Sequence, residues 1–103
     1  MNFVKIRISE SAQEDLKEGF RFYESQARGL GDYFLDSIQS DVRSLLIFAG
    51  IHAKADGFFR LLSKRFPFAI YYLTNSETID IYAILDCRRN PNWITNRVTS
   101  AKK

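Results

Sequence analysis

The chain has 103 residues, of which 46% are hydrophobic and 26% are charged, so it is expected to fold as one globular domain over residues 1–103. This composition excludes a disordered or collagen-like chain. No apolar run is long enough for a membrane-spanning helix, and the early charges do not fit a signal peptide. The single cysteine excludes an internal disulfide and fits a reducing compartment, so we expect a cytoplasmic protein. The formal net charge of the chain is +3.

The charge distribution favours an acidic partner. Residues 1–52 carry six Lys or Arg and eight Asp or Glu, whereas residues 53–103 carry nine and four. A basic half of this kind is typical of proteins that bind nucleic acid or an acidic protein segment. Ordinary surface variation is the alternative interpretation.

The first half predicts a strand followed by two helices. Residues 3–8 alternate apolar and charged side chains, as a half-buried strand does. The Ser11–Glu14 spacing predicts a capping box at the start of a helix that ends near residue 26. A turn at Gly29, where positive φ is expected, leads to a second helix over about 30–48. So short a connection makes the two helices an antiparallel hairpin.

The second half predicts three strands and a short helix. Residues 49–57 are interpreted as a loop, and strands are expected over 58–63, 66–73 and 78–85, with a hairpin turn before the last strand. A short helix begins near Pro91. In the last strand we assign Ile79, Ile81, Ala83 and Leu85 to one face and Asp80, Tyr82, Ile84 and Asp86 to the other.

These elements predict an α+β fold with the order β-α-α-β-β-β and a C-terminal helix. The three later strands are expected to form an antiparallel sheet, and one helical hairpin covers only one face of such a sheet. We therefore expect the other face to be concave and open.

The sequence offers no metal, cofactor or small-molecule site. His52 and Cys87 are the only nitrogen and sulfur ligand candidates, and a zinc site needs three or four ligands. Gly29-Leu30-Gly31 superficially matches a dinucleotide-binding loop, but a helix precedes it where a strand is required, so we interpret it as the hairpin turn.

Arginines and aromatic residues of the second half are the candidate binding groups. Arg60, Arg65, Arg88, Arg89 and Arg97 are expected near related edges of the open face, where guanidinium groups bind phosphate or carboxylate; solvated edge residues are the alternative. The strands also carry more aromatic residues than one helical hairpin buries, which indicates a surface for a partner unless the segment around Trp93 folds back over it. The aromatic set is Phe58, Phe59, Phe66, Phe68, Tyr71, Tyr72 and Tyr82.

Five segments together resemble the RelE/ParE superfamily of type II toxins, over nearly the whole chain. They are Asp15-Leu16, Tyr23-Glu24, the run from Gly29 to Leu35, the run from Arg65 to Tyr72, and Arg88-Arg89-Asn90-Pro91 with Trp93. The resemblance implies a small bacterial toxin neutralised by an antitoxin that folds as it binds. The run from Gly29 to Leu35 is more similar to the ParE branch.

Two activities divide this superfamily, and the resemblance leaves both open. RelE-like members cleave messenger RNA on the ribosome, and ParE-like members inhibit DNA gyrase by binding. A ribonuclease site would use the cations Arg60, Arg65 and Arg88, but Asp86 and Tyr82 are the only local proton-transfer candidates. An Asp among arginines is a weak base, so we favour a gyrase inhibitor without catalysis. An inactive homologue that acts only as a binding partner is the third hypothesis.

The predicted surface for antitoxin or target combines these groups. Its members are Phe58, Arg60, Arg65, Phe68, Tyr72, Tyr82, Arg88, Arg89, Trp93 and Arg97.

Overall fold

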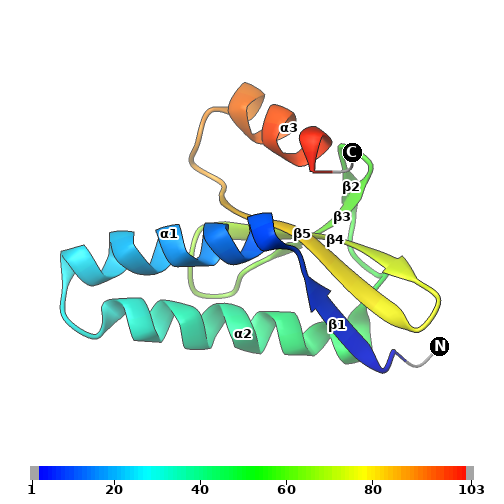
Figure 1. Ribbon diagram of the computed structural model, residues 1–103, viewed down its shortest axis with the longest axis horizontal. Coiled ribbons are helices and arrows are strands. Elements are labelled where there is room, and N and C mark those ends of the chain that lie inside the picture. The colour runs from blue at the N-terminus through cyan, green and yellow to red at the C-terminus, as the bar shows by residue number, and fades with distance from the viewer. Residues whose placement is uncertain (1–2, 102–103) are drawn as a thin grey trace.

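The computed structural model describes residues 3–101 and contains one five-stranded sheet with helices on both faces (Figure 1). The predicted α+β class and element order are confirmed. The elements in chain order are β1 (Lys5–Ile8), α1 (Glu10–Gln26), α2 (Leu30–Phe48), β2 (Lys54–Ala55), β3 (Phe58–Leu62), β4 (Phe68–Asn75), β5 (Thr78–Asp86) and α3 (Pro91–Ser100).

The sheet has the strand order β1-β5-β4-β3-β2 and is mixed rather than purely antiparallel. Strands β3, β4 and β5 form the predicted antiparallel ladder, but β1 pairs in parallel with β5. Parallel pairing needs a long crossover, which the hairpin of α1 and α2 supplies. The predicted loop over 49–57 also contains β2, a two-residue strand at one edge of the sheet.

Helix α1 begins earlier than the sequence predicted. Ser9 is the N-cap, and its hydroxyl accepts from the backbone N–H of Ala12 at 3.1 Å, whereas Ser11 lies inside the helix. The predicted capping box is therefore wrong. The reason is the sheet: the backbone N–H of Ser9 still donates to Ile81 O at 3.0 Å, so the chain leaves β1 and enters α1 without a connecting loop.

The turn between the helices is built on a glycine pair and one carboxylate. Gly29 has a φ of 85°, as predicted, and the Glu24 carboxylate accepts from the N–H groups of Gly29 at 3.0 Å and Gly31 at 2.9 Å. A Cβ on Gly31 would lie 2.7 Å from the ring of Phe20. The carboxylate also sits at the positive end of the α2 dipole, which stabilises the start of this helix.

The hairpin of α1 and α2 covers one face of the sheet and forms the main core. Phe34 and Ile38 of α2 are fully buried against Phe68, Ile70 and Tyr72 of β4. The second helix expected over about 30–48 is confirmed.

A bulge opposite Tyr71 and Tyr72 changes which side chains of β5 share a face. Tyr72 pairs with Ile81, but Tyr71 pairs with Ala83, so Tyr82 is an extra residue in β5. The predicted strict alternation is therefore wrong. Ile79, Ile81 and Ile84 belong to the core under the helical hairpin, whereas Ala83 and Leu85 belong to the core of the opposite face.

The second face is not open, because helix α3 packs on it. Val98 of α3 is fully buried there, and so are Phe58, Ala69 and Ala83 of the sheet. Figure 1 shows α3 on the side of the sheet opposite α2. The alternative in which the segment around Trp93 folds back was the correct one.

Neither long helix could span a bilayer: across the described range 3–101, every helix is too short or too polar to do so.

The end of α2 is joined to β4 through a histidine–tyrosine contact. The buried Tyr72 hydroxyl accepts from the backbone N–H of Gly50 at 2.9 Å and contacts Nδ1 of His52. Since the hydroxyl accepts from Gly50, its proton is available for an unprotonated Nδ1. Burial lowers the pKa of His52 below its usual 6.5.

Acidification is expected to destabilise the protein through His52, the only histidine of the chain. Its lowered pKa means that the unfolded state binds the proton more tightly, so the free energy of unfolding falls as the pH drops from about 6.5 through the pKa of the folded state. Urea unfolding at a series of pH values measures this effect. The matched His52→Gln variant should lack the pH dependence in that window, and an unchanged slope in the variant would contradict the assignment.

Candidate binding cleft

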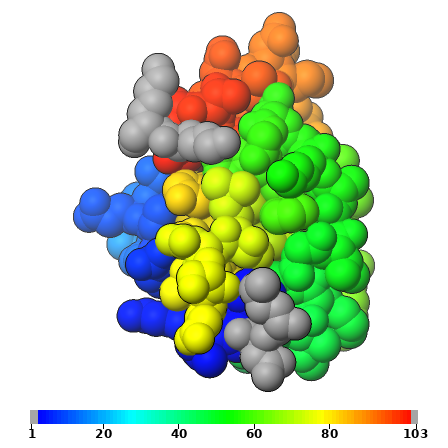
Figure 2. Space-filling view, turned by 90° about the vertical axis from the view of Figure 1, so that its right-hand side faces the viewer, coloured from blue at the N-terminus to red at the C-terminus, as the bar shows by residue number. Residues whose placement is uncertain are grey.

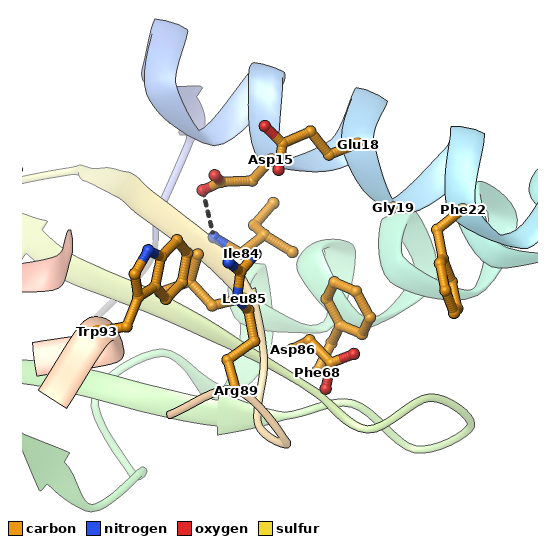
Figure 3. A pocket seen from close by; sticks show the side chains of 10 residues that line it. All are labelled: Asp15, Glu18, Gly19, Phe22, Phe68, Ile84, Leu85, Asp86, Arg89 and Trp93. Atoms are coloured by element: carbon orange, nitrogen blue, oxygen red, sulfur yellow. Dashed lines mark hydrogen bonds between the residues drawn. The ribbon is translucent and has the colours of Figure 1, made fainter. Parts of the chain in front are cut away.

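A cleft of about 370 Å³ lies between α1 and the segment that leads from β5 into α3 (Figure 3). Its floor is apolar and comes from the ends of β4 and β5, and its rims carry charged side chains. The lining residues are Asp15, Glu18, Gly19, Phe22, Phe68, Ile84, Leu85, Asp86, Arg89 and Trp93.

Gly19 gives the α1 side of the cleft its form. A Cβ at this position would lie 2.5 Å from Cζ of Phe34, which is fully buried. Glycine is therefore the residue that lets α1 approach the Phe34 ring this closely.

Asp15 and Arg97 tie α3 to α1 at one end of the cleft. The Asp15 Oδ2 atom accepts from Nη2 of Arg97 at 2.7 Å and from the backbone N–H of Ile84 at 3.0 Å. Both side chains are largely buried. Burial raises the pKa of Asp15, although the bonds from Ile84 and Arg97 act in the opposite direction.

Asp86 and Arg88 form a second ion pair at the end of β5. The Asp86 carboxylate accepts from Nη2 of Arg88 at 2.7 Å and from Nε at 3.0 Å, and the Arg88 backbone N–H donates to it at 2.8 Å. These bonds lower the pKa of Asp86. Asp86 is therefore ionised and a weak base at neutral pH.

Arg89 and Trp93 form the rim opposite α1. The Arg89 guanidinium lies 3.7 Å from the centroid of the Trp93 ring, a cation–π contact. Asn90 fixes the start of α3, because its Oδ1 accepts from the backbone N–H of Asn92 at 2.8 Å and of Trp93 at 3.3 Å. A partly exposed aromatic ring and an arginine are the side-chain types that dominate protein interfaces.

The cleft brings together six of the residues named from the sequence. Phe68, Asp86, Arg89 and Trp93 line it, and Arg88 and Arg97 bond to its walls. Arg65 is exposed in the neighbouring loop, which is held to this end of the sheet by a bond from Cys87 N–H to Pro67 O at 2.8 Å.

The remaining predicted residues lie elsewhere. Phe58 is buried under α3 with the Tyr82 ring packed on it, and Tyr72 is buried under the helical hairpin. Arg60 lies beside Tyr71 on the α3 face, whereas Arg88 lies beside Tyr23 of α1. The placement of Arg60 and Arg88 on opposite faces counts against the anion site that we expected them to share.

Sequence reasoning missed the contribution of α1 to the cleft. Asp15 and Glu18 fall off the helical apolar stripe of Ala12, Leu16, Phe20 and Tyr23, and nothing in the sequence pattern assigned Phe22 to a site. Gly19 did carry a signal, because an isolated glycine within a strong helical pattern indicates a close approach of another element.

Neither the protein-family models nor the curated proteins contain a match to this chain. Among solved structures, a chain of the "Chromosomal ParDE TA system from P. aeruginosa" has a similar fold, with a TM-score of 0.66 and 20% sequence identity over 80% of this chain and 94% of that chain. At this identity the similarity establishes the fold and not the activity. The chain therefore has the fold of a ParDE system component, as the resemblance to the RelE/ParE superfamily predicted.

Proposed function

We propose that this protein is the cytoplasmic toxin of a type II toxin–antitoxin pair, neutralised by a cognate antitoxin. The observation that carries the proposal is the fold shared with a chain of a ParDE system over most of both chains. The sequence segments that resemble the superfamily also support it. Gly29 and Gly31 build the turn between the helices, and Arg89 and Trp93 build one rim of the cleft.

We assign the toxin a mode of action by binding rather than by catalysis, with DNA gyrase as the expected target. Ribonuclease chemistry needs a base for the 2′-hydroxyl and free cations for the phosphate. Asp86 is held ionised by Arg88, and Arg88 is occupied by Asp86. Tyr82 packs against Phe58, and Arg60 lies on the far face from Arg88. Asp86 and Arg88 are therefore paired with each other and Arg60 is separated from them, whereas Arg65 is exposed in the neighbouring loop.

The cleft between α1 and α3 is the surface that we assign to the target. It combines an apolar floor with Arg89 and Trp93 on its rim, and α3 is fixed in place by the Asp15–Arg97 pair. A rigid, partly apolar concavity binds a protein side chain at low entropic cost.

The experiment follows gyrase activity and cell growth. Expression of the chain alone is expected to slow growth, and the purified protein is expected to leave supercoiled plasmid cleaved or unresolved when gyrase is present. Trp93→Ala is expected to lose most of this effect, whereas Leu62→Ala, at an exposed apolar position outside the cleft, should retain it.

Other outcomes would redirect the assignment. Codon-specific cuts in translated messenger RNA that vanish in Arg65→Ala would show a ribonuclease and contradict inhibition by binding. Normal growth on expression of the chain would indicate an inactive homologue.

A further inference from the structure

The end of α2 carries a cluster of exposed apolar side chains. Exposed hydrophobic residues scattered singly are normal on a protein surface, but here four occur within six positions. Ile47 is 78% exposed, Ile51 is 73%, Phe48 is 49% and Leu46 is 39%. We name Leu46, Ile47, Phe48 and Ile51 the α2-end patch. None of these residues lines the cleft between α1 and α3.

The patch is held in a defined conformation. Leu45 anchors the last turn of α2 in the core, and its carbonyl accepts from Ala49 N–H at 3.0 Å. After the helix, Ile51 N–H donates to Phe48 O at 3.3 Å, and Gly50 is bonded to the Tyr72 hydroxyl. A partner that binds here meets a backbone that is already fixed, which reduces the entropic cost of binding.

The charged residues that flank the patch along the chain are basic. Arg43 lies one turn before Ile47 on the same face of α2, and Lys54 follows in β2 with its amine 5.0 Å from the Phe59 ring. The sequence has no acidic residue from 42 to 55. The patch is therefore apolar, and its nearest charged residues along the chain, Arg43 and Lys54, are cations.

We infer that the α2-end patch binds an acidic, amphipathic segment of the antitoxin; this inference rests on the proposed function. A segment with apolar residues on one face and carboxylates beside them matches both the patch and these flanking cations. Figure 2 shows that the end of α2 and the segment after it, in green, form one side of the molecular surface beside the β4–β5 hairpin. A segment bound there gains contacts without displacing any element of the fold.

Two other occupants fit less well. A second copy related by a two-fold axis would bring the same cations, Arg43 and Lys54, toward one another. An anionic membrane would meet the exposed carboxylates Asp32 and Asp36 along the outer side of α2, whereas surface-binding helices are rich in Lys and Arg on their polar face.

The test measures binding of the intact chain to the product of the reading frame that adjoins its gene, by titration calorimetry. Ile47→Glu places a carboxylate at the centre of the patch and is expected to weaken binding by about tenfold or more. Arg43→Glu is expected to weaken binding several-fold, with an effect that shrinks as the salt concentration rises. Both positions are exposed, so circular dichroism should show an unchanged fold.

Matched controls sit away from the patch. Leu62→Glu introduces the same carboxylate at another exposed apolar position, and Arg28→Glu reverses a charge at the opposite end of the helical hairpin. Both controls should bind within about twofold of the wild type, since neither residue borders the patch.

The outcomes separate this inference from the proposed function. If the chain slows growth and binds the product but Ile47→Glu binds equally well, only the inference is overturned. If the chain neither slows growth nor binds the product, the proposed function fails with it. Two further measurements complete the test: binding of the protein to vesicles with about 30% anionic lipid, and sedimentation of the protein alone to detect self-association. Binding or self-association that Ile47→Glu abolishes would assign the patch to a membrane or to a second copy instead.

Discussion

Replacing Phe34 with alanine is expected to lower the free energy of unfolding by about 3–5 kcal/mol. Phe34 is fully buried where both helices meet the sheet. Its ring centroid lies 5.1 Å from that of Tyr23, 5.2 Å from Phe66 and 4.8 Å from Phe68. The variant removes the side chain that these rings surround, and Gly19 offers no atoms to fill the space. Urea unfolding followed by circular dichroism measures the loss.

Tyr33→Ala is the matched control for this prediction. Tyr33 is the adjacent aromatic residue of α2, but it is half exposed, and its ring is tilted against that of Phe66 with centroids 5.6 Å apart. Its removal is expected to cost about 1 kcal/mol or less, because little apolar surface is returned to water. Equal losses in Tyr33→Ala and Phe34→Ala would show that the aromatic cluster is not centred on Phe34.

Asp15→Ala is expected to destabilise the protein by about 3 kcal/mol and to loosen α3. The substitution leaves the Ile84 N–H without its acceptor and Arg97 without its counter-charge, both in largely buried positions. Trp93 is the only tryptophan of the chain and lies in α3, so its fluorescence reports the state of that helix. We expect its emission to shift to longer wavelength in the variant under native conditions.

Asp15→Asn separates the two roles of this carboxylate. The amide oxygen still accepts from Ile84 N–H, while the negative charge beside Arg97 is lost. Burial raises the pKa of Asp15, which means that the folded protein does not favour the charged carboxylate over the neutral form. A neutral amide that keeps the acceptor should therefore retain most of the free energy of unfolding. We expect Asp15→Asn to cost about 1 kcal/mol or less. A loss as large as that of Asp15→Ala would mean that the charge, not the acceptor, holds α3.

Local patterns predicted the helices and the long strands because the signals lie within a few residues of each other. The apolar stripe that includes Phe34 and Ile38 specified α2, and Gly29 specified the turn before it. The start of α1 was predicted wrongly because two serines compete for the cap. Ser9 was selected by its bond to Ile81, a residue more than seventy positions away.

The candidate site was predictable in part for the same reason. Arg88, Arg89 and Trp93 follow β5 directly in the chain, so their common location follows from one turn. We grouped Arg60 with these residues because we assumed that one face of the sheet is open. In the structure, side chains alternate between the two faces along β3, and this alternation places Arg60 beside Tyr71 of β4. The part played by α1 depends on Gly19 meeting Phe34 of α2; the isolated glycine indicates a close approach, but nothing within α1 identifies the approaching residue.

The sequence by itself determined the α+β class and the order of the elements, because periodicity and turn chemistry act over short stretches of chain. The resemblance to RelE/ParE toxins came from the residue identities of five segments. Only the tertiary structure decided the parallel pairing of β1 with β5, the change of face at Tyr82 and the packing of α3. Each of these depends on burying apolar surface between segments far apart in the chain. The face left uncovered by one helical hairpin was too apolar to remain in water, and Val98 of α3 buries part of it.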